Sequence, residues 1–263
     1  MTRLQIVGGG RMGEALIGGI LSSGWAVASD LRIVEAAPAR RDELTALFPG
    51  AVVATEPADA DGTIVATKPA DIPAVVAAVT AAGGGRVLSI AAGVTLATLE
   101  AAAGPGVAVV RAMPNTPALI GAGASAIAGG TSASGADLDW AESLLGAVGT
   151  VVRVTERQLD AVTGLSGSGP AYVFLIAEAM VDAGVVAGLP RDLSTTLAFQ
   201  TLVGSARLLA EGDASPADLR AAVTSPGGTT AAGVQVLERN AVRAALVDAV
   251  LAARDRATEL SAS

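Results

Sequence analysis

The chain has 263 residues, of which 51% are hydrophobic and 2% aromatic, and it carries a formal net charge of −8. This length allows two domains with cores built mainly from Ala, Val, Leu and Ile, and the negative charge argues against a nucleic-acid partner. The chain has no cysteine and no histidine. That composition excludes disulfides, thiol catalysis and the commonest metal ligands, so we expect no metal site.

The first part of the chain alternates short apolar runs with helical stretches such as Met12–Leu21 and Arg40–Leu47. Strands are expected at Leu4–Val7, Leu31–Val34, Ala51–Val53, Thr63–Ala66, Arg86–Ile90, Val107–Arg111, Ser125–Ala128 and Val151–Val154. Such alternation is typical of a parallel sheet covered by helices on both faces. The sequence therefore predicts a doubly wound, mostly parallel α/β domain over residues 1–155.

A glycine-rich turn, GGGRMG at residues 8–13, follows the first expected strand and opens the first helix. It fits the dinucleotide-binding pattern G-x-G-x-x-G. In this pattern the first glycine allows a tight turn, the second lets a pyrophosphate approach, and the third lets the helix pack on the strand. The pattern predicts a Rossmann domain whose cofactor-binding residues include Gly8, Gly10, Arg11, Met12 and Gly13.

The residues after the second expected strand bear on the choice of cofactor. Glu35 stands where a carboxylate hydrogen-bonds the 2′-hydroxyl of the adenosine ribose and favours NADH. An ordinary solvated carboxylate is the alternative. Arg40 and Arg41 follow closely and could instead neutralise the 2′-phosphate of NADPH, so the sequence leaves both cofactors open.

Two further loops follow strands at the edge where ligands of such sheets bind. Lys68, in the fourth-strand loop, could bond the nicotinamide ribose or be a plain surface lysine. Asn115 lies between two prolines that stiffen the loop Met113–Pro117 after the sixth strand, where a purely structural turn is the alternative. The expected cofactor contacts from these loops are Ala66, Thr67, Lys68, Pro69 and Asn115.

From Thr155 onward the pattern is helical only, and Thr155 with Gln158 fits a capping box. Helices are expected at residues 171–186, 193–209, from Ser215 onward, and at residues 241–260. The helix Ala171–Val186 is expected to be long and largely buried. The sequence thus predicts an all-α domain over residues 156–263.

The run Thr224–Thr230 (TSPGGTT) carries hydroxyls and backbone N–H groups but no charge. It lies between a helix expected to end near Val223 and another expected to begin near Thr230. Adjacent glycines let the backbone approach a ligand closely, and a helix N-terminus favours an anion. The run is therefore a candidate anion site, with a plain inter-helix turn as the alternative.

Together these motifs resemble those of the pyrroline-5-carboxylate reductase family, which reduces a cyclic imine to proline with NAD(P)H. The resemblance spans essentially the whole chain and rests on residues 8–13, 66–69, 89–93, 113–117, 160–172 (DAVTGLSGSGPAY) and 223–238 (VTSPGGTTAAGVQVLE). It implies a Rossmann domain followed by an all-α dimerisation domain. It also implies a substrate site at the interface of a homodimer, and dimers that assemble further into decameric rings.

Matched position by position, the family's substrate loop corresponds to Ser225, Gly227, Gly228 and Thr229, which would hold the substrate carboxylate. The family's hydroxyl beside the imine nitrogen corresponds to Thr230, the candidate catalytic residue. Its expected role is positioning, because a threonine hydroxyl is a weak acid. Most family members prefer NADPH, which the carboxylate after the second strand puts in question.

The roles of Ser166, Ser168 and Glu178 stay open, with helix packing and an interface as the expectation for them. A β-hydroxyacid dehydrogenase is a competing interpretation, but it needs a lysine on the long helix, and residues 171–186 contain none. A dinucleotide-binding regulatory protein is another, but it would have no need of the loop Ser225–Thr230.

No membrane partner is expected from the sequence. The longest uncharged stretch, Ala112–Ala136, is interrupted by prolines and glycines. The first strand begins almost at once and is followed by Arg11 and Glu14, which do not suit a signal peptide. We therefore expect a cytoplasmic protein.

Overall fold

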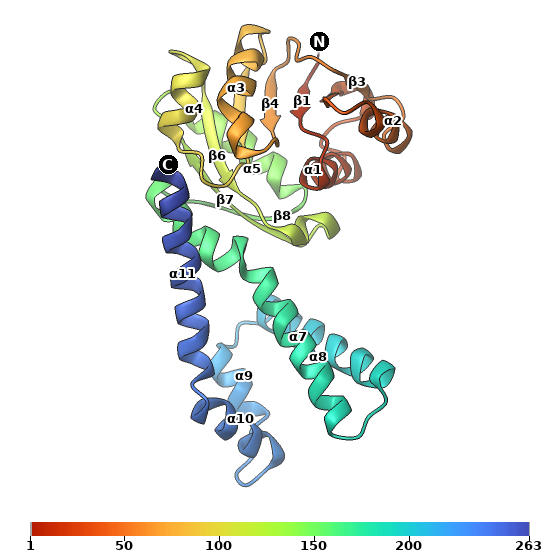
Figure 1. Cartoon of the computed structure of the whole chain (residues 1–263), viewed down its shortest axis with the longest axis vertical. Coiled ribbons are helices and arrows are strands. Elements are labelled where there is room, and N and C mark those ends of the chain that lie inside the picture. The colour runs from red at the N-terminus through yellow and green to blue at the C-terminus, as the bar shows by residue number, and fades with distance from the viewer. Residues whose placement is uncertain (1, 263) are drawn as a thin grey trace. The chain divides into compact units, whose positions relative to one another are not determined.

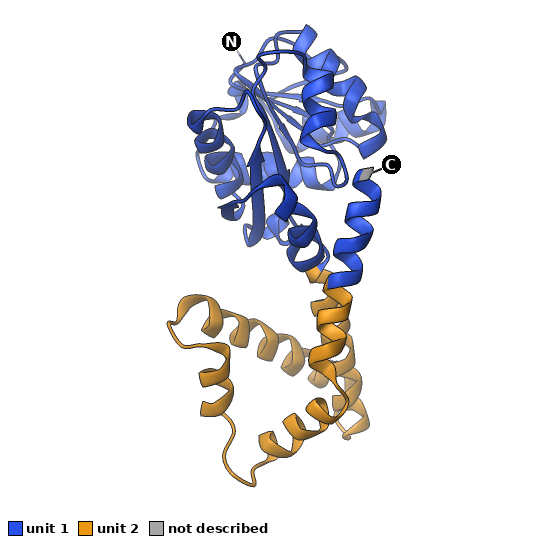
Figure 2. Cartoon of the chain, turned by 90° about the vertical axis from the view of Figure 1, so that its left-hand side faces the viewer, with its two compact units in different colours: residues 1–168, 251–263 blue, residues 169–250 orange. Residues whose placement is uncertain are grey.

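The computed structural model describes residues 2–262, which fall into two compact units (Figure 2). One unit, here the sheet unit, comprises residues 1–168 and 251–263, and the other, here the helical unit, comprises residues 169–250. The sheet unit is therefore discontinuous in sequence, because the helical unit is inserted between its two segments.

The sheet unit contains an eight-stranded sheet with the order β3-β2-β1-β4-β5-β6-β7-β8. Figure 1 labels most of these strands and the helices around them. The strands are β1 Leu4–Val7, β2 Leu31–Val34, β3 Val52–Ala54, β4 Gly62–Val65, β5 Arg86–Ser89, β6 Val109–Met113, β7 Gly123–Gly129 and β8 Gly149–Arg153. Neighbouring strands pair in parallel except β6 and β7. The chain between β6 and β7 is too short for a parallel crossover, so β7 returns antiparallel. The predicted doubly wound, mostly parallel sheet is confirmed.

Helices cover both faces of this sheet, and alternate strand residues point to opposite faces. The helices are α1 Arg11–Ser22, α2 Pro38–Leu47, α3 Ile72–Ala81, α4 Leu96–Ala103, α5 Gly135–Gly146 and α6 Leu159–Val162. The isoleucines of the central strands, including Ile6 and Ile64, form one buried cluster with α1, α2 and α5. The valines that follow them, including Val7 and Val65, form a second cluster with α3, α4 and α6.

The helical unit consists of α7 Gly169–Val186, α8 Arg191–Glu211, α9 Pro216–Ala222, α10 Thr229–Arg239 and the first part of α11 Val242–Ala262. The first two helices pack together through a buried hydroxyl, because Ser194 Oγ donates to the carbonyl of Val181 at 2.7 Å. A Cβ at Gly184 would collide with that hydroxyl. The helix expected from Ser215 onward is present, and Ser215 is its N-cap, since Ser215 Oγ accepts from the Asp218 N–H at 3.2 Å.

The prediction that the long helix is largely buried is wrong for the single chain. Only Val181 of α7 is buried, whereas Phe174 is 60% and Leu175 is 66% exposed. The apolar composition of α7 indicates a helix that packs against a partner, but within one chain α8 covers only part of the surface of α7. By length and composition alone, the helical segment Glu156–Val186 is apolar enough to cross a membrane.

The strand–helix alternation ends at Arg153, close to the boundary expected near residue 155. The predicted capping box is present, with the Thr155 N–H donating to Gln158 Oε1 at 2.9 Å. The compact units divide later, after Ser168. The reason is that α6 belongs to the core of the sheet unit, where Leu159 is buried among the valines of the second cluster.

Candidate functional site

The turn between β1 and α1 is a close-fitting backbone cradle. Gly8 has a positive φ of 104°, and a Cβ there would lie 2.6 Å from the carbonyl oxygen of Ala66. A Cβ at Gly13 would collide with the carbonyl oxygen of Gly8. Gly10 is the N-cap of α1 and faces open space. Gly8 and Gly13 thus leave no room for a side chain, and Gly10 leaves space for a ligand, as the dinucleotide pattern requires.

A cleft of about 670 Å³ opens beside this turn, at the carboxyl ends of β1, β2 and β4. Six of its lining residues are predicted cofactor residues: Gly8, Gly10, Glu35, Ala66, Thr67 and Lys68. The hydroxyl of Thr67 is buried and has no hydrogen-bond partner among the described residues. Parallel sheets bind ligands where the strand order reverses, and the chain here runs outward in both directions from β1 and β4. The cleft therefore has the position, the size and an unpaired polar group suited to a dinucleotide.

Glu35 and the two arginines that follow it all have partners within the protein. Glu35 Oε2 accepts from the Gly9 N–H and Oε1 accepts from the Ala37 N–H, both at 2.9 Å. Arg41 Nη1 donates to the carbonyls of Glu35 at 3.0 Å and Ala36 at 2.6 Å. The carboxylate is thus fixed at the mouth of the cleft, and Arg41 is held by backbone acceptors.

Arg40 does not line this cleft but lines a neighbouring hollow, together with Gly10 and Glu14. Its Nε donates to the carbonyl of Gly9 at 2.7 Å, Nη1 donates to Glu43 Oε2 at 2.6 Å, and Nη2 is paired with Glu14. The hydrogen bonds with Glu43 and then Glu14 raise the pKa of Arg40. Sequence reasoning treated Arg40 as a candidate phosphate ligand and missed these partners, which lie on three different elements.

The remaining predicted cofactor residues lie at the edges of the cleft or away from it. Arg11 is exposed and lines a neighbouring hollow of about 540 Å³ beside Gly10. Met12 packs against the core below α1. Pro69 begins a 3₁₀ turn directly after Lys68, but neither it nor Asn115 lines the cleft.

Asn115 is 9% exposed, and its amide holds two segments of the sheet unit together. Its Nδ2 donates to the carbonyl of Ser166 at 3.0 Å, and its Oδ1 accepts from the Ala124 N–H at 2.8 Å. Ser166 belongs to a π-turn at Thr163–Gly167, a rare backbone feature that is frequent at functional sites. The amide keeps donor and acceptor capacity beyond these contacts.

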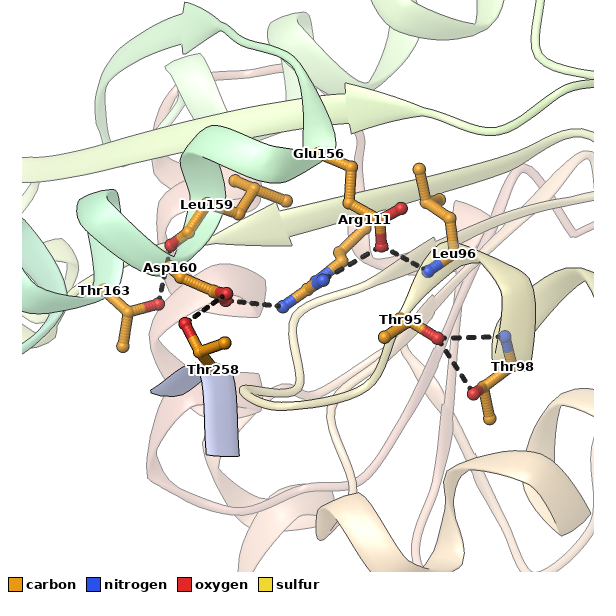
Figure 3. Close-up of polar contacts among 9 residues, drawn as sticks. All are labelled: Thr95, Leu96, Thr98, Arg111, Glu156, Leu159, Asp160, Thr163 and Thr258. Atoms are coloured by element: carbon orange, nitrogen blue, oxygen red, sulfur yellow. Dashed lines mark hydrogen bonds and ion pairs between the residues drawn. The ribbon is translucent and has the colours of Figure 1, made fainter. Parts of the chain in front are cut away.

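An ion-pair network between a buried arginine and two partly exposed carboxylates lies nearby (Figure 3). The side chain of Arg111, in β6, is 2.9 Å from Glu156 and 3.8 Å from Asp160. Glu156 also accepts from the Leu96 N–H at 2.6 Å, and Asp160 accepts from the Thr258 hydroxyl at 2.9 Å. An arginine inside an apolar strand was the available sequence signal, because a buried charge needs a partner.

The loop between α9 and α10 presents the start of a helix. The predicted end near Val223 and start near Thr230 agree with the observed helices. Gly227 has φ 70°, the Gly228 N–H donates to the carbonyl of Ser225 at 3.0 Å, and Gly228 is the N-cap of α10. The first backbone N–H groups of α10, from Thr229 onward, therefore have no acceptor within their own helix.

The structure brings each predicted set of residues together within its own unit. The cleft residues lie in the sheet unit, and Ser225, Gly227, Gly228, Thr229 and Thr230 lie in the helical unit. Ser166 and Ser168 belong to the sheet unit and Glu178 to the helical unit. Among residues 2–262 no group of three or more acidic side chains could hold a metal ion.

Two family models match the chain. The model for pyrroline-5-carboxylate reductase dimerisation matches residues 156–260. The model described as NADP oxidoreductase, coenzyme F420-dependent, matches residues 3–93. The two matches fall on the helical part and on the first strands of the sheet.

Curated relatives and solved structures are similar over nearly the full length. The pyrroline-5-carboxylate reductase of Synechocystis is 43% identical over 262 residues, covering 98% of both chains. That of Mycobacterium tuberculosis is 44% identical, covering 99% of this chain and 97% of its own. The structure of the Coxiella burnetii reductase has a TM-score of 0.92 at 33% identity, covering 99% of this chain and 98% of that one. The Plasmodium falciparum enzyme with NADP bound has a TM-score of 0.86 at 28% identity, with the same coverage.

Proposed function

The chain belongs to the pyrroline-5-carboxylate reductase family, and from this premise we propose how its two units share one reduction. The protein is an oxidoreductase of proline biosynthesis that reduces pyrroline-5-carboxylate to proline. The observation that carries this conclusion is the similarity to curated reductases over 98% of the chain at 43% identity. Neither competing interpretation accounts for a match that includes both the sheet and the helical part.

We propose that the cleft of the sheet unit holds the dinucleotide. Gly8, Gly10, Arg11, Met12 and Gly13 would bind the pyrophosphate at the N-terminus of α1, where backbone N–H groups and the helix dipole favour an anion. Ala66, Thr67, Lys68 and Pro69 would border the nicotinamide ribose. Asn115 would contribute from the same edge, through the loop that its amide holds. When bound, the reduced nicotinamide supplies a hydride.

The preferred cofactor is proposed to be NADH. The Glu35 carboxylate lies at the mouth of the cleft, which Glu56 and Asp71 also line. These negative charges would repel a 2′-phosphate, whereas a 2′-hydroxyl can donate to Glu35. Arg40 and Arg41 already have acceptors within the protein. The match to an NADP oxidoreductase model covers residues 3–93, which include Glu35, Arg40 and Arg41, and it does not decide between NADH and NADPH.

The α9–α10 loop is proposed to bind the substrate carboxylate. Ser225, Gly227, Gly228 and Thr229 would surround it with backbone N–H groups and hydroxyls at the start of α10. Thr230, one residue further along, would hydrogen-bond the ring nitrogen. In the reaction the C=N bond of the protonated imine accepts a hydride at carbon and becomes a C–N single bond. Thr230 would orient the nitrogen for this step rather than protonate it.

A homodimer through the helical unit is the proposed minimal assembly. The match to a dimerisation model covers residues 156–260, which include the exposed apolar surface of α7 and α8. The apolar segment Glu156–Val186, which is long enough to cross a membrane, lies within the same match. A second copy of the chain therefore explains the apolar composition of this segment better than lipid does. A ring of such dimers and a cytoplasmic location complete the proposal.

The test is the loss of reduced-nicotinamide absorbance with pyrroline-5-carboxylate, run in parallel with NADH and NADPH. Turnover that needs the imine is expected with both cofactors, with the larger kcat/KM for NADH. Binding of either cofactor without turnover would overturn the assigned reaction. A larger kcat/KM for NADPH would overturn the cofactor proposal and leave the reaction standing.

A further inference from the structure

The backbone of Gly9 is held on both its N–H and its carbonyl side within the dinucleotide-binding turn. Its N–H donates to Glu35 Oε2 at 2.9 Å, and its carbonyl oxygen accepts from Arg40 Nε at 2.7 Å. A Cβ at this position would collide with the side chain of Leu44. At Gly9, the residue between the first two pattern glycines, the turn is therefore fixed by the residue that follows β2 and by α2.

Arg40 can hold the turn because its guanidinium is itself oriented. Glu43, on the same helix, binds Nη1, and Glu14, on α1, binds Nη2. The Arg40 side chain is 24% exposed. A guanidinium presents its donors in one rigid plane. To reach a phosphate elsewhere, Arg40 would have to give up the Gly9 carbonyl and both carboxylates together.

We infer that Arg40 is a positioning residue for the dinucleotide: it fixes the Gly9 carbonyl, and with it the Gly9–Gly10 peptide group, so that the N–H groups of the turn are aligned before the cofactor binds. It is not a ligand of the adenosine 2′ substituent. The inference rests on the proposed cofactor role of this cleft. It explains why an arginine six residues after the second strand does not contradict a preference for NADH.

The experiment measures the Kd of the full-length protein for NADH and for NADPH, using the fluorescence of the reduced nicotinamide, together with kcat at saturating NADH. Arg40→Met should raise both dissociation constants by about tenfold, the scale of one lost charge-assisted hydrogen bond. The value of kcat should change by less than about twofold, since alignment of the turn acts on binding. Arg40→Lys keeps the positive charge but loses the planar set of guanidinium donors, so it should recover only part of the affinity for the two cofactors.

Arg153 offers a matched control, because it also pairs with two carboxylates, Asp139 and Glu142, on a distant part of the sheet unit. Arg153→Met should leave both dissociation constants unchanged. If Arg40→Met does not fold, Glu14→Gln removes one ion pair of the Arg40 guanidinium while keeping a side chain of similar size. This variant should raise the Kd for NADH and for NADPH by about threefold.

Three results would overturn the inference. The first is an unchanged Kd for NADH in both Arg40→Met and Glu14→Gln. The second is a selective loss of NADPH affinity in Arg40→Met, which would make Arg40 a phosphate ligand. The third, wild-type protein that binds neither cofactor, would reject the dinucleotide role of the cleft itself and is recognised before any variant is made.

Discussion

At the scale of single residues, the site depends on groups whose hydrogen bonds are already made within the protein. Glu35 accepts two backbone N–H groups, and the amide of Asn115 joins Ser166 to Ala124. In contrast, the buried hydroxyl of Thr67 has no partner among the described residues. Ligand contacts are therefore expected at groups that can still form hydrogen bonds, namely the Thr67 hydroxyl and the remaining lone pairs of the Glu35 carboxylate.

Glu35 should determine the choice between the two nicotinamide cofactors. Replacing Glu35 with Ser removes the charge that opposes a 2′-phosphate, so we expect the NADPH/NADH ratio of kcat/KM to rise by about tenfold or more. Affinity for NADH should fall as well, because the Gly9 and Ala37 N–H groups lose their acceptor. Steady-state kinetics with both cofactors measure this, with Glu142→Gln on α5 as a charge-matched control. An unchanged ratio would place the ribose contact elsewhere.

Thr230 should matter for turnover rather than for folding. Thr230→Ala removes the hydroxyl proposed to orient the imine nitrogen, and we expect kcat to fall by about 10- to 100-fold. The melting temperature of the Thr230→Ala variant should match that of the wild type, because Thr230 lies in the first turn of a surface helix. Thr196→Ala, which deletes a hydroxyl that bonds only within α8, should keep wild-type kcat. Wild-type kcat in Thr230→Ala would remove this residue from the mechanism.

The sequence was sufficient for residues whose role depends on local backbone geometry. The glycines at positions 8 and 13 could be predicted, because a tight turn between a strand and a helix excludes a Cβ there. The contacts of Arg40 with Gly9 and Glu14 and that of Asn115 with Ser166 could not, since these partners lie on segments far away in the chain. A pattern of spacing shows which side chain is unusual, but the contacts that satisfy it depend on the tertiary fold.

At the scale of elements, strands and helices follow the hydrophobic periodicity closely. All eight expected strands are present, and β1 and β2 have the expected bounds. The antiparallel turn into β7 and the π-turn at Thr163–Gly167 were not expected. The first follows from the length of a connection, the second accepts a hydrogen bond from Asn115 at Ser166, and neither leaves a periodic signal in the sequence.

The loop between α9 and α10 should tolerate little added bulk. A Cβ at Gly228 would lie 2.5 Å from Ser225 Oγ, so Gly228→Val should distort the turn that precedes α10. We expect the KM for pyrroline-5-carboxylate to rise by about tenfold while the Kd for NADH stays unchanged. Gly135→Val serves as a control, since its Cβ would meet nothing within 4 Å. Wild-type KM in Gly228→Val would contradict the carboxylate site.

At the scale of the whole molecule, one chain leaves much of the helical unit uncovered. The exposed large apolar side chains on α7 and α8 are Val173, Phe174, Leu175, Ile176, Met180, Val186, Leu193, Leu197, Phe199, Val203, Leu208 and Leu209. Soluble monomers rarely expose patches of this extent. The expectation that α7 is buried was therefore wrong for the single chain, and an assembly of chains is the proposed cover.

A charge placed on that surface should separate the proposed dimer. Phe174 is 60% exposed in one chain, so Phe174→Glu should cost the monomer little but would bury a carboxylate in an apolar interface. We expect light scattering after size exclusion to show the mass of one chain for this variant and at least two for the wild type. Val52→Glu, at an edge-strand residue that is 50% exposed, should keep the wild-type mass. Identical masses for Phe174→Glu and the wild type would move the interface elsewhere.

The discontinuity of the sheet unit has a consequence for how the protein is made. Residues 251–262 belong to that unit, where Thr258 bonds Asp160 and Leu260 lies against Gly93. During synthesis the strands emerge first, yet their unit lacks these contacts until the helical unit has been translated. A nascent chain stalled within the helical unit would therefore carry a nucleotide-binding fold that lacks only the contacts made by residues 251–262.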